Sequence, residues 1–115
     1  MRGNFAALNI KKGEISLAID AIVLNSSDNV ATAVQDLKAG QQATVRFGRE
    51  LSEIAMGEDV PYGHKLAVRL IHKGEDILKY GEVIGRATAD IKSGCHAHVQ
   101  NVESMRGRGD LRKEG

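Results

Sequence analysis

The chain has 115 residues, of which 42% are hydrophobic and 27% charged, and its formal net charge is +1. This length fits one domain with a single modest core. Aromatic residues make up only 3% and Trp is absent, which argues against a stacking platform for nucleic acid. No stretch is apolar for long enough to span a bilayer, and a lone cysteine cannot form an intrachain disulfide. We therefore expect a cytoplasmic protein that binds neither nucleic acid nor membranes.

One helix is predicted, over residues 29–39. Asp28 is placed to cap its first turn, and Gly40 is placed to end it. The apolar residues between them fall on one face at helical spacing: Val30, Val34 and Leu37.

Period-two alternation of apolar residues predicts strands elsewhere in the chain. The predicted strand segments are residues 14–24, 43–47, 66–70, 77–84 and 95–102, with turn signals about every ten residues in the second half. The segment 51–56 is ambiguous. The sequence thus predicts a mainly β domain of short strands over residues 1–105. Residues 106–115 are rich in Gly and charge, and we interpret them as a flexible tail or linker.

The histidines are the residues that most clearly suggest chemistry. His96 and His98 are two apart, so on a strand both imidazoles project to the same side and form half of a site for a divalent cation. The alternative is two solvent-facing side chains. His64 and Lys65 follow a predicted bend, where they could bind a carboxylate, although from the residues alone a plain surface pair at the start of a strand is the preferred interpretation. Cys95 is expected to point away from His96 and to be an inert thiol.

Four ordered segments resemble the altronate/galactarate dehydratase family. Residues 59–67 read DVPYGHKLA, and residues 73–87 read KGEDILKYGEVIGRA. Residues 28–33, DNVATA, resemble the opening motif of the family, and residues 96–101, HAHVQN, resemble its closing motif.

The resemblance implies a small N-terminal SAF-type domain with a β-clip fold, either fused to a large catalytic dehydratase domain or acting as its small subunit. It implies removal of water from a hexonate or hexarate to give a 2-keto-3-deoxy acid, with Fe²⁺ or Mn²⁺ as cofactor. On this basis His64 is the expected catalytic residue, and His96 and His98 are the expected metal ligands. The substrate-binding residues implied by the same motifs are Lys65, Asp28, Asn29, Tyr80 and Asn101.

Two other functions fit the same motifs. A sister enzyme of the family, a sulfolactate sulfo-lyase, has a similarly short subunit. SAF-type domains also serve as non-catalytic carbohydrate- or protein-binding modules, which need no converging histidines. The enzyme interpretation therefore predicts that His64 lies beside at least one of His96 and His98. Because exposed edge strands tend to be covered, we also expect a partner or self-association into homo-oligomers.

Overall fold

The computed structural model describes residues 18–104. Over this range the chain forms nine strands in two sheets and contains no helix. The prediction of a mainly β domain is therefore confirmed. Within the same range no helix is present that could cross a membrane.

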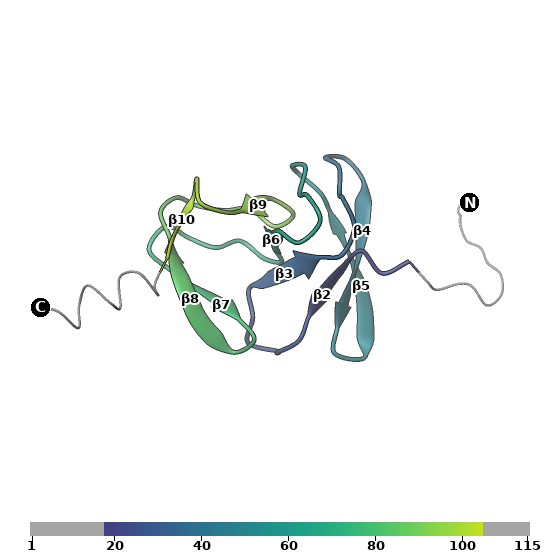
Figure 1. Cartoon of the computed structure of the whole chain (residues 1–115), viewed down its shortest axis with the longest axis horizontal. Coiled ribbons are helices and arrows are strands. Elements are labelled where there is room, and N and C mark those ends of the chain that lie inside the picture. Colours follow the sequence, from purple (N-terminus) through teal and green to yellow (C-terminus); the bar gives the residue numbers. More distant parts are fainter. Residues whose placement is uncertain (1–17, 105–115) are drawn as a thin grey trace, which may run out of the picture.

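The larger sheet has six strands in the order β5-β4-β2-β3-β6-β9 (Figure 1). Its strands are β2 (Ala21–Val23), β3 (Val30–Ala33), β4 (Gln42–Phe47), β5 (Glu50–Ala55), β6 (Lys65–Ala67) and β9 (His96–Ala97). β2 and β4 are parallel, whereas the other neighbours are antiparallel. β9 is the edge strand beside β6, so it brings the predicted metal ligands to the strand that follows His64.

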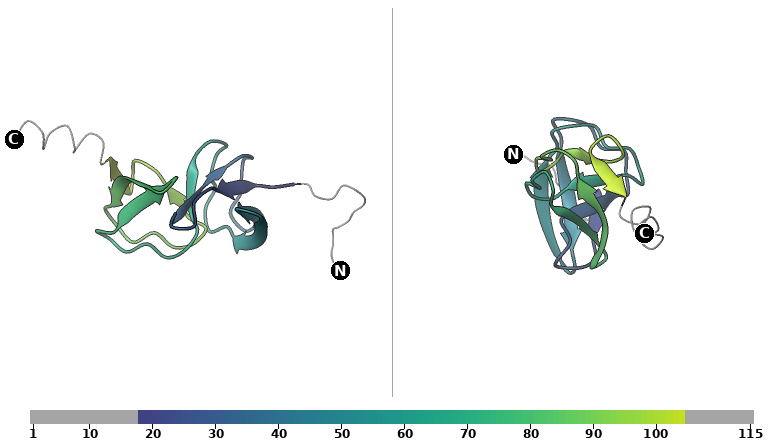
Figure 2. Two further views of the ribbon diagram at one scale, coloured as in Figure 1. Left: turned by 90° about the horizontal axis from the view of Figure 1, so that it is seen from below. Right: turned by 90° about the vertical axis from the view of Figure 1, so that its left-hand side faces the viewer.

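The smaller sheet has three antiparallel strands in the order β10-β8-β7. They are β7 (Asp76–Lys79), β8 (Glu82–Ala87) and β10 (Val102–Ser104). β10 and the segment that leads into β2 lie at opposite ends of the long axis (Figure 2).

The predicted helix over residues 29–39 is wrong. Residues 30–33 form strand β3, paired with β2 on one side and β6 on the other. Leu37 instead forms an isolated antiparallel bridge with Val60. The apolar residues of this segment reach the core without a helix because β3 lies inside the sheet, where residues on both faces are covered: Val30, Ala31 and Ala33 are all about 1% exposed.

The predicted strands are found in shorter form. The segment 43–47 belongs to β4, and the ambiguous 51–56 is mostly β5. Segment 77–84 lies in the β7–β8 hairpin. Of segment 66–70, only the first two residues belong to a strand, at the end of β6. The 95–102 segment holds β9 and the first residue of β10. Of the first segment, 14–24, the structure describes residues 18–24, which contain β2; the predicted tail, 106–115, lies outside the described residues.

Four turns of one kind connect the strands. They span residues 38–41, 61–64, 72–75 and 92–95, and in each the last N–H donates to the first carbonyl. Glycine is the third residue of every one, with φ of +84° to +92°, which a side chain disfavours. Two isolated bridges, Leu37 with Val60 and Ile71 with Ile91, join these turns in pairs. The second of these turns leads directly into His64.

Two hydrophobic clusters form the core. One lies against the strands β2, β4 and β5 and includes Leu37, Val60 and Leu66. The other joins the two sheets and contains Val30, Ala67, Ile71, Ile77, Ala87, Ile91 and Ala97. Ala97 is fully buried in this second cluster, which anchors β9 and fixes the direction of the residues on either side of it.

Candidate functional site

His64 is held at the end of a tight turn. Gly63 has a φ of +86°, and the His64 N–H donates to the Pro61 carbonyl at 3.0 Å. The carbonyl of His64 accepts the N–H of Ala33 at 2.9 Å, and the Gly63 N–H donates to the Ala33 carbonyl at 2.8 Å. The turn is thus fastened to the end of β3, so His64 has a fixed position.

His96 and His98 project from the same side of β9. Ala97 between them points into the core, so its two neighbours face away from it and are partly buried. β9 pairs with β6 so that His96 lies opposite Leu66, two residues after His64. This register brings the segment that contains His64 beside the segment that contains His96 and His98.

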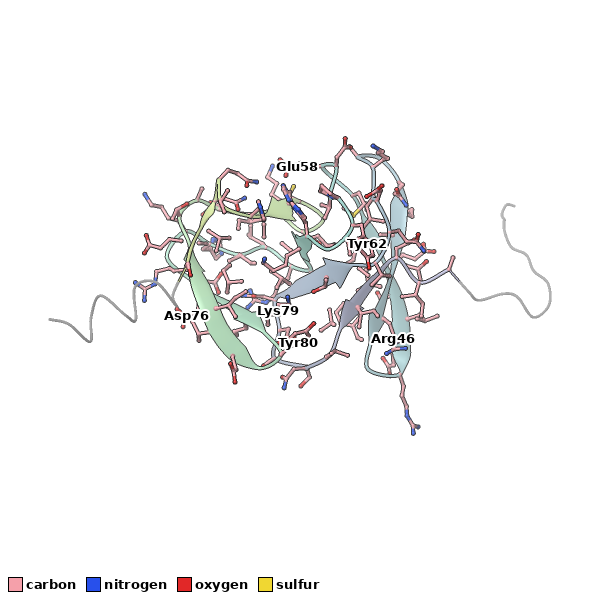
Figure 3. The ribbon with its side chains drawn as sticks, viewed as in Figure 1. Arg46, Glu58, Tyr62, Asp76, Lys79 and Tyr80 are labelled. Carbon is pink, nitrogen blue, oxygen red and sulfur yellow. The ribbon has the colours of Figure 1, made fainter. Side chains whose placement is uncertain are left out.

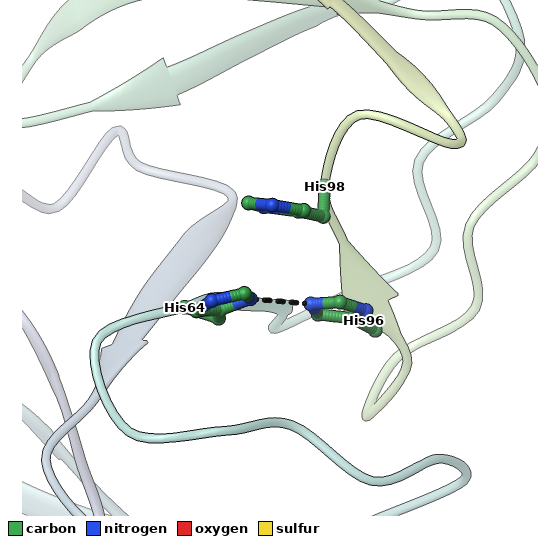
Figure 4. A group of neighbouring side chains, drawn as sticks. All are labelled: His64, His96 and His98. Carbon is green, nitrogen blue, oxygen red and sulfur yellow. Dashed lines mark hydrogen bonds between the residues drawn. The ribbon is translucent and has the colours of Figure 1, made fainter.

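The three histidines converge, as the sequence predicted (Figure 4). The Nδ1 atom of His64 lies 2.9 Å from Nε2 of His96. The ring of His98 stacks on that of His64, with centroids 4.2 Å apart. One nitrogen of each ring lies within 4.8 Å of the other two, which makes a group that could hold a metal ion. We call His64, His96 and His98 the histidine cluster.

Asn101 holds the His-x-His segment in shape. Its Oδ1 accepts the N–H of His98 and its Nδ2 donates to the carbonyl of His96, both at 2.9 Å. The side-chain amide thus forms hydrogen bonds with the backbone of both His96 and His98. Its predicted role as a substrate ligand is untested, but this position makes it a positioning residue for the cluster.

Glu58 also contacts the cluster, a role that was not predicted from the sequence. Its Oε1 accepts the N–H of His96 at 2.9 Å. Glu58 lies 38 residues earlier in the chain, in the connection between β5 and β6. The neighbouring residue Gly57 donates its N–H to the carbonyl of Gly94 at 2.9 Å, so the segment after β5 is joined directly to the turn before β9.

The surroundings of His96 and His98 favour the neutral form of these two imidazoles. Partial burial, and then the nearby charges of the other histidines, lower the pKa of His96. The pKa of His98 is lowered in the same way, by burial first and then by His64 and Lys65. Burial and the neighbouring Lys79 lower the pKa of Lys65, which is half-buried next to His64 in the chain. A neutral imidazole has a lone pair free for a metal, so the cluster is suited to be a ligand set.

Cys95 takes no part in the cluster. Its side chain packs against the second core cluster, and burial raises the pKa of its thiol. A thiol with a raised pKa is a poor nucleophile at neutral pH, in agreement with the prediction that it is inert.

The side chains of Asp28 and Asn29 form hydrogen bonds within the fold. The two carboxylate oxygens of Asp28 accept the N–H groups of Tyr80 and Gly81, each at 2.8 Å. Asn29 is fully buried; its Oδ1 accepts from Leu78 and its Nδ2 donates to the Asp76 carbonyl. Both side chains fasten the β7–β8 hairpin to the segment before β3, and Asp28 caps no helix.

Tyr80 is separated from the histidine cluster. It sits in the β7–β8 turn with a φ of +58°, and its ring lies 5.0 Å from the ammonium of Lys79. In Figure 3 it lies on the lower side of the molecule, whereas Glu58, which contacts His96, lies on the upper side. Of the predicted site residues, Lys65 and Asn101 thus accompany the cluster, and Asp28, Asn29 and Tyr80 form a second group at the hairpin.

Comparison with known proteins shows one consistent relationship. The sequence profile of the altronate/galactarate dehydratase SAF domain matches residues 19–105. The altronate dehydratase of Escherichia coli K12 is 39% identical over 83 residues, which are 72% of this chain and 16% of that enzyme. The galactarate dehydratase (L-threo-forming) of the same organism is 41% identical over 73 residues, 64% of this chain and 13% of that enzyme.

A much shorter relative also matches. The (2R)-sulfolactate sulfo-lyase subunit alpha of Chromohalobacter salexigens is 34% identical over 93 residues, which are 78% of this chain and 99% of that subunit. The chain therefore spans a small part of the two dehydratases but almost the whole length of the sulfo-lyase subunit.

Proposed function

The chain belongs to the family of altronate/galactarate dehydratase SAF domains, and from this premise we propose that it is the small component of a lyase acting on a sugar acid or a related 2-hydroxy acid. In this proposal it works beside a large catalytic subunit or domain, in the cytoplasm, and helps remove water to leave a 2-keto-3-deoxy acid. The observation that carries the proposal is the convergence of His64, His96 and His98.

The residues present fit a divalent cation. The donor set is three imidazole nitrogens, which suit iron, manganese and zinc, and all three lie within 4.8 Å of one another. His64, His96 and His98 would hold the ion, with Asn101 and Glu58 fixing the backbone that carries them. When bound, such a cation supplies positive charge that stabilises the enolate formed next to a carboxylate.

Lys65 adds a second positive group to the site. Its positive charge contributes to the lowered pKa values of both His96 and His98. A half-buried ammonium of this kind is suited to hold the carboxylate of the substrate. Because Nδ1 of His64 points at His96, we assign His64 to the ligand set and expect the base that removes the α-proton to come from the large partner.

The test is an anaerobic elimination assay. The chain is combined with the large lyase polypeptide of its own organism and Fe²⁺ or Mn²⁺, and 2-keto acid formation is followed from altronate and galactarate. Turnover that requires the chain, and falls at least about 100-fold in His64→Ala but not in His72→Ala, supports the proposal. No turnover from a folded partner on any substrate contradicts it.

A sulfo-lyase is the second candidate function. The observation in its favour is that the similarity extends over 99% of the sulfolactate sulfo-lyase subunit alpha, at 34% identity. Both reactions remove the α-proton of a 2-hydroxy acid and expel a group from its β-carbon, hydroxide in one case and sulfite in the other, so the same cluster could serve either. Sulfolactate as a third substrate, with released sulfite measured beside the 2-keto acid, distinguishes the two.

A further inference from the structure

Two large apolar side chains stand exposed at the turns that carry the histidine cluster. Tyr62 is 68% exposed and Val99 is 82% exposed. Tyr62 is the second residue of the 61–64 turn, which ends at His64. Val99 is the second residue of the 98–101 turn, which begins at His98 and is closed by the Asn101 N–H. In the sequence, each of the two side chains thus lies within two residues of a cluster histidine, Tyr62 before His64 and Val99 after His98.

The other turns do not share this feature. The second residue of the remaining three glycine turns is Ala39, Lys73 or Ser93, which are small or polar. Singly exposed apolar residues are common on protein surfaces and mean little by themselves. Among these five turns, however, large apolar tips occur at the two that hold cluster histidines. Tyrosine is also a residue type enriched in interfaces.

The backbone that carries both tips is held in place before any partner binds. The N–H of Tyr62 donates to Oδ1 of Asp36 at 2.8 Å, and the turn around Val99 is closed by the Asn101 backbone and side chain. A turn whose backbone is already ordered loses less conformational entropy on binding, so more of the contact energy remains as affinity.

The relatives indicate which kind of partner is available to bind here. The matched region is 16% of the altronate dehydratase, so most of that enzyme is a larger polypeptide attached to it. The sulfo-lyase relative is itself named as a subunit. Three histidine nitrogens also leave a divalent cation short of ligands, because Fe²⁺ and Mn²⁺ take more than three.

We propose that the large lyase polypeptide docks on the face of the histidine cluster, with Tyr62 and Val99 as apolar anchors, and completes the site there. This inference rests on the proposed function, which assigns the chain a large catalytic partner. It adds which face binds that partner and places the reaction at the boundary between the two parts.

The experiment uses the complex with the large lyase polypeptide of the same organism, or the intact polypeptide where both parts are one chain. Hydrogen exchange is compared with and without the partner, or, in the fused form, between the isolated chain and the whole. Affinity is then measured for Tyr62→Ser and Val99→Ser. The matched controls are Leu51→Ser on β5 and Val83→Ser on β8, which remove apolar residues of 59% and 42% exposure elsewhere.

Protection over residues 61–64 and 98–101 is expected, with at least about 10-fold weaker binding for each anchor variant and unchanged binding for the controls. A different result would be an active complex in which β5 or the β7–β8 turn is protected from exchange and both anchor variants bind normally. That result overturns this inference and leaves the proposed function intact. Absence of both complex and turnover with a folded partner overturns the proposed function and this inference together.

Discussion

The Nδ1 atom of His64 lies 2.9 Å from the Nε2 atom of His96, although 32 residues separate the two in the chain. At this distance the two nitrogens form a hydrogen bond, in which the tautomers decide which ring donates the proton and which accepts it. The same two nitrogens would face a cation held by the cluster. A divalent cation and the proton of this hydrogen bond therefore compete for the same two nitrogen atoms.

Alanine substitution of any cluster histidine should weaken cation binding. We expect His64→Ala, His96→Ala and His98→Ala each to lower the affinity for Mn²⁺ or Zn²⁺ by more than about 10-fold, since even outer-shell partners of a metal site contribute that much. Isothermal titration calorimetry on the isolated chain measures the affinities. His72→Ala is the control, because His72 is exposed in a different turn. Equal affinity in all four variants would rule out the cluster as the binding site.

The stability of the metal-free chain should fall in mild acid. The pKa values of His96 and His98 are lowered in the folded chain, whereas in the unfolded chain they lie near their ordinary value of about 6.5. As the pH falls below about 6.5 the unfolded state takes up protons first, so folding stability decreases until the pH has passed the lowered folded values, below which both states are protonated and the decrease ends. Thermal melts between pH 7.5 and 5.0 in the presence of a chelator should show a smaller decrease for the double variant His96→Gln, His98→Gln. An equal decrease in both proteins would contradict the assignment.

The sequence predicted the centre of the site but not its support. A His-x-His pair on a strand indicates two imidazoles on one side, and that pattern is local. Convergence with His64 was predicted from the enzyme interpretation that the family resemblance implies, and it depends on the pairing of β6 with β9. Glu58 could not be found in this way, because its contact with His96 arises from the tertiary fold alone.

The predicted helix shows how a local pattern can mislead. Val30, Val34 and Leu37 have helical spacing, and Asp28 is a good capping residue by type. In the structure the carboxylate of Asp28 accepts N–H groups more than 50 residues away, at Tyr80 and Gly81. Neighbouring strands on both sides of β3 then supply hydrogen bonds that outweigh the weak helix preference of the segment.

Asn101 should act on the cation through the backbone of the cluster. Asn101→Ala removes the acceptor of the His98 N–H and the donor to the His96 carbonyl, so we expect a roughly 10- to 100-fold loss of Mn²⁺ affinity. Asn101→Asp keeps the acceptor, and it should recover part of that affinity. Calorimetry measures binding, and thermal melts separate it from a stability loss of about 1 kcal/mol. Normal affinity in Asn101→Ala would show that the residue does not position the cluster.

Asn29 should contribute to stability rather than to the site. Its substitution by alanine leaves the N–H of Leu78 and the carbonyl of Asp76 without their side-chain partner in a buried region, at a cost of roughly 2–4 kcal/mol. Urea unfolding measures the change. Asn25→Ala is the control, because Asn25 is exposed and bonds only within its own turn among the interactions described for it, with an expected cost below about 1 kcal/mol. A small loss for Asn29→Ala together with weakened substrate binding would instead support the substrate-ligand prediction.

Gly94 should tolerate a side chain far less than Gly74, although both are the third residue of the same kind of turn. Their φ angles, +84° and +91°, are nearly equal, so the cost of the left-handed conformation, about 1–2 kcal/mol, is common to both. A Cβ on Gly74 meets nothing within 4 Å, whereas a Cβ on Gly94 would overlap the backbone carbonyl of Ala55. We therefore expect Gly94→Ala to destabilise the fold by at least about 2 kcal/mol more than Gly74→Ala. Because Gly94 lies two residues before His96, the same variant should also lose cation affinity. Urea unfolding and calorimetry on both variants test this, and equal stabilities would show that β5 and the turn before β9 do not approach each other so closely.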